Sequence, residues 1–244
     1  MMRLVLLVTI LGCGRIDFGS RSDATDDTTT PIDAAPTFVD TFDRGISILG
    51  NGWTEKNPGT FAISSQHVIR TDYTRDYRDS LASRPVSEAL ADVEVSIEFT
   101  VGHLPPGYPQ IHARVQSATI ATPNTLDGYL LFIDGTDGTG LMTADITRQH
   151  GTSLPPPLVT FALSPPLALG NTYRLRFAVS GASPVKLDGF VELQSGTAWS
   201  TIGMVSTTDS GVTAVVQPGV VGFDAGQPEA AGYYTYDQFT YRAL

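Results

Sequence analysis

The stretch VEVSIEFTV, residues 93–101, decides the fold class of this chain. Its odd positions hold Val, Val, Ile, Phe and Val, and its even positions hold Glu, Ser, Glu and Thr. Strict alternation of this kind predicts a β-strand with one face in a hydrophobic core and the other toward solvent. The pattern returns in YRLRFAV (173–179) and in QIHARVQ (110–116). In the latter, the side chains expected to point into the core are Ile111, Ala113 and Val115.

Short strands are expected along the rest of the chain, separated by Gly, Pro, Asn and Asp. Their ranges are 38–43, 60–63, 67–71, 129–134, 141–147, 158–163, 185–193, 197–202, 219–224 and 233–242. No long stretch shows the period of a helix. The 244 residues include 24 glycines and 16 prolines, and only 16% are charged, which fits one turn-rich domain. The sequence therefore predicts an all-β sandwich or barrel.

The beginning of the chain, MMRLVLLVTILGC, has the features of an export signal. Arg3 precedes an apolar run over residues 4–11, which is far shorter than the roughly 20 residues that span a membrane. Residues 10–13, ILGC, resemble the lipobox of bacterial lipoproteins. The resemblance implies that residues 1–12 are a signal peptide and that Cys13 carries the lipid that anchors the protein to a membrane. The alternative is a buried N-terminal strand with an ordinary core cysteine.

The segment after the lipobox is acidic and polar. Residues 14–37 contain five Asp, five Thr and two Pro, and few large apolar side chains. Such a composition predicts a flexible tether over 13–37, because it cannot bury enough surface to fold, and leaves 38–244 as the folded domain. The residue after Cys13 is Gly14 rather than the Asp that retains enterobacterial lipoproteins at the inner membrane. We therefore expect a lipid-anchored protein of the bacterial cell envelope, on the outer membrane.

Charge and cysteine content narrow the possible partners. The formal net charge is −10, and no cluster of Lys and Arg stands out, so the phosphate backbone of a nucleic acid would be repelled. The single cysteine excludes an intrachain disulfide. We expect a monomer that does not bind nucleic acid.

The order of landmarks along the domain resembles concanavalin A-like jelly-roll domains of the laminin-G-like kind. Those domains open with a Phe-Asp-Phe strand and a Trp, carry an Arg in a middle strand, and close with a Gly-rich strand and an Asp-x-Phe strand. The counterparts here are Phe38, Asp40, Phe42, Trp53, Arg114, Gly222, Asp237 and Phe239. The resemblance implies a two-sheet antiparallel jelly-roll sandwich. One of its faces binds glycans in many relatives.

Residues 110–112, Gln-Ile-His, match a motif of jelly-roll alginate lyases. In that family the Gln neutralises the uronate carboxyl and a His or Tyr removes a proton, beside an Arg. The resemblance implies a ligand site with Gln110, His112 and Arg114 on one strand face, joined by Tyr234 and Tyr236. The Tyr-Phe-Lys-Ala-Gly motif of the family is missing, which leaves an ordinary polar strand face as the alternative.

Glu94 and Glu98 share a strand face with Ser96 between them. Laminarinase-type glycosidases, which have the same fold, carry Glu-x-Asp-x-Glu at such a place and use the two carboxylates as nucleophile and acid/base. Ser96 replaces the central Asp, so we expect no activity of this type. The alternative is the polar face of an amphipathic strand. Trp53 and Trp199 could stack on sugars, or belong to the core.

The stretch DGTDGTG, residues 134–140, brings two carboxylates and several glycines together. Asp134 and Asp137 could bind Ca²⁺, as laminin-G-like domains often do, or the Asp-Gly pairs could simply form a hairpin turn. Three functions follow from these observations. The first is a non-catalytic carbohydrate- or surface-binding lipoprotein. The second is a structural or partner-binding envelope protein, and the third is a uronate lyase.

Overall fold

A computed structural model of the chain describes residues 37–74, 77–104, 108–134, 141–153, 155–226 and 233–244. The predicted signal peptide, Cys13, Asp137 and all of the predicted tether except Thr37 lie outside these residues. The strands are β1 (Thr37–Asp40), β2 (Thr54–Glu55), β3 (Phe61–Ser64), β4 (His67–Arg70), β5 (Ala82–Ser83), β6 (Val93–Val101), β7 (Tyr108–Val115), β8 (Gly128–Asp134), β9 (Thr143–Gln149), β10 (Val159–Ala162), β11 (Thr172–Ser180), β12 (Val185–Ser195), β13 (Ala198–Asp209), β14 (Val220–Gly226) and β15 (Tyr234–Ala243).

Helical structure in the described residues is limited to three short turns. They are η1 (Tyr77–Asp79), η2 (Val86–Glu88) and α1 (Ser117–Ile120). None of the helices in these ranges is long and apolar enough to cross a membrane. The all-β prediction is thereby confirmed.

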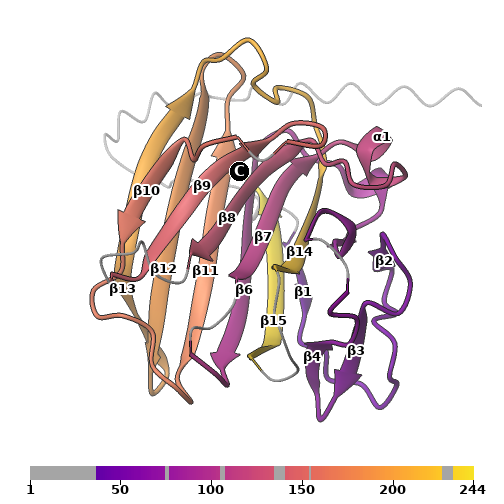
Figure 1. Ribbon diagram of the computed structural model, residues 1–244, viewed down its shortest axis with the longest axis vertical. Coiled ribbons are helices and arrows are strands. Elements are labelled where there is room, and N and C mark those ends of the chain that lie inside the picture. Colours follow the sequence, from indigo (N-terminus) through magenta and orange to yellow (C-terminus); the bar gives the residue numbers. More distant parts are fainter. Residues whose placement is uncertain (1–36, 75–76, 105–107, 135–140, 154, 227–232) are drawn as a thin grey trace, which may run out of the picture. The chain divides into compact units, whose positions relative to one another are not determined.

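The strands form two antiparallel sheets, stacked one in front of the other in Figure 1. The eight-stranded sheet has the order β13-β12-β11-β6-β15-β4-β3, and β1 also pairs with β15. The seven-stranded sheet has the order β10-β9-β8-β7-β14-β5-β2. Neighbours in space are often far apart in the sequence, as β7 and β14 are, which is typical of a jelly roll. The predicted two-sheet jelly-roll sandwich is confirmed.

The hydrophobic core lies between the sheets, because each strand turns its apolar positions inward. Strand β6 alternates between buried and half-buried side chains along its whole length, as its sequence predicts. Its partners β11 and β15 alternate in register with it. From the seven-stranded sheet, Ile111, Leu131, Ile146 and Phe223 pack into the same cluster. Burial of this apolar surface is the main stabilising term of the fold.

The landmark residues near the start of the domain have a structural role. The Asp40 carboxylate is buried and accepts hydrogen bonds from the Trp53 Nε1 (2.7 Å), the Phe42 backbone N–H (2.8 Å) and the Arg44 guanidinium (2.6 Å). The Trp53 ring lies 4.9 Å from the centroids of Phe223 and Phe239. Trp53 is thus partly buried and packs against the core, and the Asp40 carboxylate fixes its indole.

The end of β7 departs from the predicted pattern. Arg114 has a positive φ of 53°, and the register with β14 shifts there, which is the geometry of a β-bulge. Because the extra residue reverses the side-chain alternation, Val115 leaves the main core and packs with Leu81, Leu126 and Val220 in a second cluster. The prediction that Val115 points the same way as Ile111 and Ala113 is therefore wrong.

Candidate functional site

The candidate site is the outer face of the seven-stranded sheet, the face turned away from the main core. Cross-strand partners share a face, so the register places the outward side chains in two rows. The first row runs Asp224, Gln110, Phe132, Asp145 across β14, β7, β8 and β9. The second row runs Gly222, His112, Leu130, Thr147 across the same strands. Two apolar side chains in the middle are thus flanked by polar ones.

Four polar side chains of these rows are buried and have at least one atom without a hydrogen-bond partner. Gln110, His112, Asp145 and Thr147 are at most 5% exposed. Atoms without a hydrogen-bond partner are Gln110 Oε1, both ring nitrogens of His112, Asp145 Oδ1 and Thr147 Oγ1. An unsatisfied buried polar group costs about 1–3 kcal/mol. Four such side chains, on β7 and β9 to either side of β8, therefore mark this face as a candidate functional site.

The charge state of the face follows from its burial. Burial lowers the pKa of His112 from 6.5 to about 3, so the imidazole is neutral at pH 7. The pKa of Asp145 is raised, chiefly by burial and further by the nearby Asp134 carboxylate. A hydrogen bond from the Thr160 hydroxyl offsets part of this rise. At the other end of the row, on β14, the Asp224 carboxylate accepts a hydrogen bond from the Ser80 hydroxyl. The face therefore combines carboxylates with a neutral imidazole.

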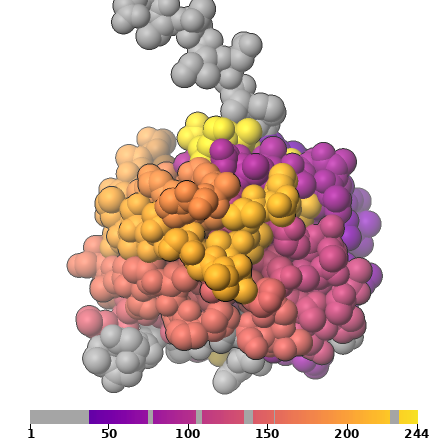
Figure 2. All heavy atoms as spheres, turned by 90° about the horizontal axis from the view of Figure 1, so that it is seen from above, coloured from indigo at the N-terminus to yellow at the C-terminus, as the bar shows by residue number. Residues whose placement is uncertain are grey.

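Arg114 does not join His112 on this face. Its guanidinium turns to the end of the sandwich and donates to the backbone carbonyls of Gly181 (2.7 Å) and Val215 (2.9 Å) and to the Asp92 carboxylate (3.1 Å). Figure 2 looks onto this end, where residues around 210–220, in golden orange, run across the surface. The bulge causes the difference, since it rotates Arg114 away from the face that its position in the sequence predicts.

The two predicted tyrosines are also elsewhere. Tyr234 and Tyr236 lie in the main core, on the inner face of the eight-stranded sheet. The Tyr236 hydroxyl donates to the Asp224 backbone carbonyl and accepts from the Gln110 N–H at 3.4 Å. The structure thus brings together Gln110 and His112 only. A uronate lyase would require an arginine and a tyrosine beside these two residues, and the described part of the chain places neither there. The residue of β14 that lies beside His112 is Gly222.

Gly222 is required by packing. A Cβ at this position would lie 2.3 Å from the Ala82 backbone oxygen of β5, closer than any real contact. The glycine landmark noticed in the sequence therefore allows β5 to pair closely with β14.

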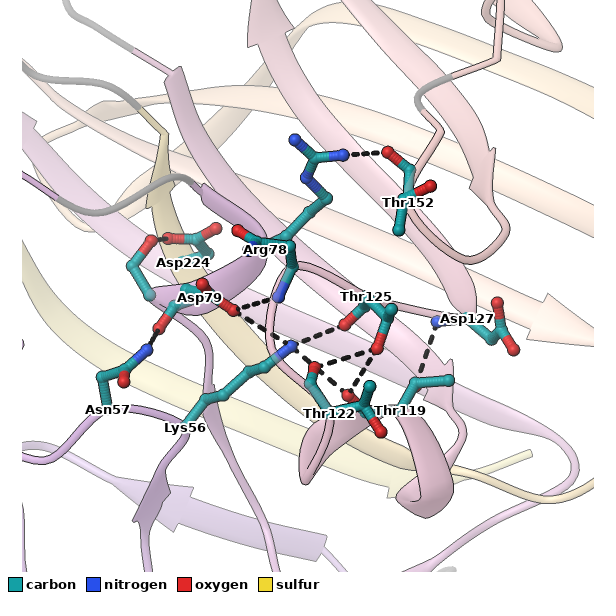
Figure 3. Close-up of polar contacts among 12 residues, drawn as sticks. Lys56, Asn57, Arg78, Asp79, Thr119, Thr122, Thr125, Asp127, Thr152 and Asp224 are labelled. Carbon is teal, nitrogen blue, oxygen red and sulfur yellow. Dashed lines mark hydrogen bonds and ion pairs between the residues drawn. The ribbon is translucent and has the colours of Figure 1, made fainter.

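A buried ion pair fixes the loops at one border of this face, as Figure 3 shows. The Lys56 ammonium lies 3.3 Å from Asp79 Oδ1 and donates to the backbone carbonyls of Thr119 (3.3 Å) and Thr125 (2.5 Å). The Asn57 side chain donates to the Asp79 carbonyl at 2.6 Å. These contacts join the turn after β2, the η1 segment before β5 and the connection between β7 and β8. Sequence reasoning missed them, because nothing in these separate local sequences signals the pairing.

The outer face of the eight-stranded sheet carries a ladder of ion pairs. Glu94 accepts from Arg176 at 3.2 Å and from Arg242 at 3.1 Å, and Arg176 also reaches Glu192. The Arg174 guanidinium carbon lies over the Trp199 ring, 4.4 Å from the centre of that ring. Glu94 is thus held between two arginines on a polar strand face, which is the structural alternative to a glycosidase carboxylate.

The proposed calcium site is described only in part. Asp134 ends β8, whereas Asp137 lies outside the described ranges. Within those ranges, no group of three or more His, Cys, Asp or Glu side chains could hold a metal ion.

Comparisons with known proteins find likeness in structure only. No protein-family profile and no curated protein match the sequence. Among solved structures, the Emp47p carbohydrate recognition domain has a TM-score of 0.52 at 10% identity, with 90% of this chain and 99% of that one covered. The VIP36 exoplasmic/lumenal domain, solved in a Ca²⁺/Man3GlcNAc-bound form, has a TM-score of 0.51 at 16% identity, with 80% and 87% covered.

A third solved structure, the GH43 protein BlXynB from Bacillus licheniformis, has a TM-score of 0.53 at 15% identity. The match covers 84% of this chain but spans only 39% of that protein. At these identities the likeness defines the fold alone. The chain is a concanavalin A-like jelly-roll sandwich, an architecture that it shares with carbohydrate-binding lectin domains.

Proposed function

We propose that this protein is a non-catalytic, glycan-binding lipoprotein of the bacterial cell envelope. One observation carries the binding function: four buried polar side chains with open hydrogen-bonding capacity surround Leu130 and Phe132 on one sheet face. Ligand sites are typically apolar with a few convergent polar groups. The apolar centre would meet the C–H face of a sugar, and the polar atoms would meet its hydroxyls.

The anchoring part of the proposal rests on the sequence. ILGC at residues 10–13 would place a lipid on Cys13, and the acidic segment that follows would separate the domain from the outer membrane. A tethered binding domain needs no catalytic residues. The separation of His112 from Arg114 and both tyrosines supports a role without turnover.

A glycan array on the whole chain tests the proposal. We expect at least one glycan class to bind without being cleaved, and Gln110→Ala to weaken that binding. Gln238→Ala is the matched control, because Gln238 lies on the outer face of the other sheet, opposite Glu98. Silence on every glycan, or equal effects of the two substitutions, would contradict the proposal.

A further inference from the structure

The open atoms of the candidate face are mostly acceptors. Gln110 Oε1 can only accept a hydrogen bond, and so can Asp145 Oδ1 when its carboxyl is ionised. Thr147 Oγ1 can donate or accept, and the neutral His112 ring offers one donor and one acceptor. A ligand that satisfies them must bring more donors than acceptors.

The charge of the face points in the same direction. The four strands that form the two rows contain only two cationic residues, Arg114 and Arg148. Arg114 is held at the end of the sandwich, and Arg148 is paired with Asp209 at 2.7 Å. Asp145 and Asp224 thus share a row to which these strands contribute no cation.

We propose that this face selects a glycan with a protonated amine, an amino sugar without its acetyl group, and that the ammonium binds Asp145 Oδ1. This inference rests on the proposed function and names the ligand class of the same site. Gln110 lies two strands from Asp145, about 10 Å across the sheet, with Phe132 between them. A sugar on Phe132 can therefore place its ammonium at Asp145 and its hydroxyls toward Gln110 and Thr147.

The same geometry disfavours uronates. A ligand carboxylate at this place would face Asp145 and Asp224 with like charge, and the described cations near Asp224, Arg78 and Lys56, already donate to backbone carbonyls. The burial that raises the pKa of Asp145 also supports a cationic ligand, because an ammonium at Oδ1 would stabilise the ionised carboxylate that burial disfavours.

Calorimetric titration of the whole chain at pH 6 tests the inference. The probes are a glucosamine oligomer, the same oligomer fully N-acetylated, a uronate oligomer and CaCl₂ alone. We expect the glucosamine oligomer to bind best. Asp145→Asn should weaken its binding about 10- to 100-fold, as expected for one charge-assisted hydrogen bond. Asp188→Asn is the matched control, because Asp188 lies in β12 of the other sheet beside Lys186.

The outcomes separate this inference from the proposed function. If the acetylated or uronate oligomer binds better than the free amine, or if Asp145→Asn behaves like Asp188→Asn, the amine preference is wrong while glycan binding stands. Binding of CaCl₂ alone that Asp145→Asn abolishes would assign the position to a metal ion and overturn the inference. If no glycan binds, both proposals fail. The comparison of oligomers on the unsubstituted chain does not depend on how any variant folds.

Discussion

The buried imidazole of His112 should make the stability of the domain depend on pH. His112 is 1% exposed and has no hydrogen-bond partner within the described residues, so burial lowers its pKa to about 3, whereas the unfolded chain protonates near 6.5. Between pH 3 and pH 6.5, His112 is protonated in the unfolded state but not in the folded state. Stability is therefore fully present above pH 6.5 and is lost as the pH falls toward 3.

The size of the effect follows from the two pKa values. One pKa unit corresponds to about 1.4 kcal/mol, so lowering the pH from 7 to 4.5 should cost about 2.5 kcal/mol through this residue. Other groups titrate in the same range, and a difference measurement removes their contribution. His112→Gln keeps a donor and an acceptor but cannot be protonated, so the stability gap between the two proteins should change by about 2.5 kcal/mol.

Urea unfolding of both proteins at pH 7 and pH 4.5 measures this change. His103→Gln, which removes a solvent-exposed imidazole, is the matched control. A stability gap between wild type and His112→Gln that stays constant with pH would refute the reasoning, because it would mean that His112 accepts its proton as easily in the folded protein as in the unfolded one.

Three further predictions follow. Arg114→Met should destabilise the domain by about 1.5–3 kcal/mol in urea unfolding, because the buried Arg114 side chain is the donor to the carbonyls of Gly181 and Val215 and to Asp92. Arg176→Met, on the partly exposed ladder, should cost about 1 kcal/mol or less, and equal costs would argue against the role of Arg114. Burial raises the pKa of Asp40, but the hydrogen bonds from Arg44, Trp53, Phe42 and Asn51 bring it below 3.8, so its contribution to stability is present above pH 3.8 and is lost as the pH falls further. Asp40→Asn should therefore remove about 1.5–3 kcal/mol at pH 7. A loss that is just as large at pH 2 would contradict this. Cys13→Ser should move the protein from the membrane fraction to the soluble fraction of the cell; continued membrane association at the wild-type level would rule out the lipid anchor.

The fold could be predicted because its main signal is local. Strands β6 and β11 alternate in sequence as they do in burial, since one face of each meets the core and the other is partly exposed. The signal weakens where both faces are covered. Every residue of β14 is buried, so VVGFDAG shows no clear alternation although it lies in the middle of a sheet.

The candidate site could be predicted only in part, because its residues meet through long-range pairing. Gln110 and His112 were found from a short motif, but Asp145 and Thr147 join them only through β8. The period-two polar pattern of β9, Thr-Ala-Asp-Ile-Thr, is the signal that could have found them. The bulge that removes Arg114 could not be foreseen, since no glycine marks its positive φ.

Glycan binding at the outer face of the seven-stranded sheet is tested most directly by the affinity of the whole chain for its best array glycan, measured for wild type and for His112→Leu at pH 7. At this pH the imidazole is neutral in the folded protein, so both side chains are uncharged and the substitution removes the hydrogen bonds that His112 offers to the ligand. We expect an affinity loss of about 5- to 10-fold, as expected for one neutral hydrogen bond. Unchanged affinity in a variant that unfolds at the same urea concentration would place the glycan elsewhere and contradict the account.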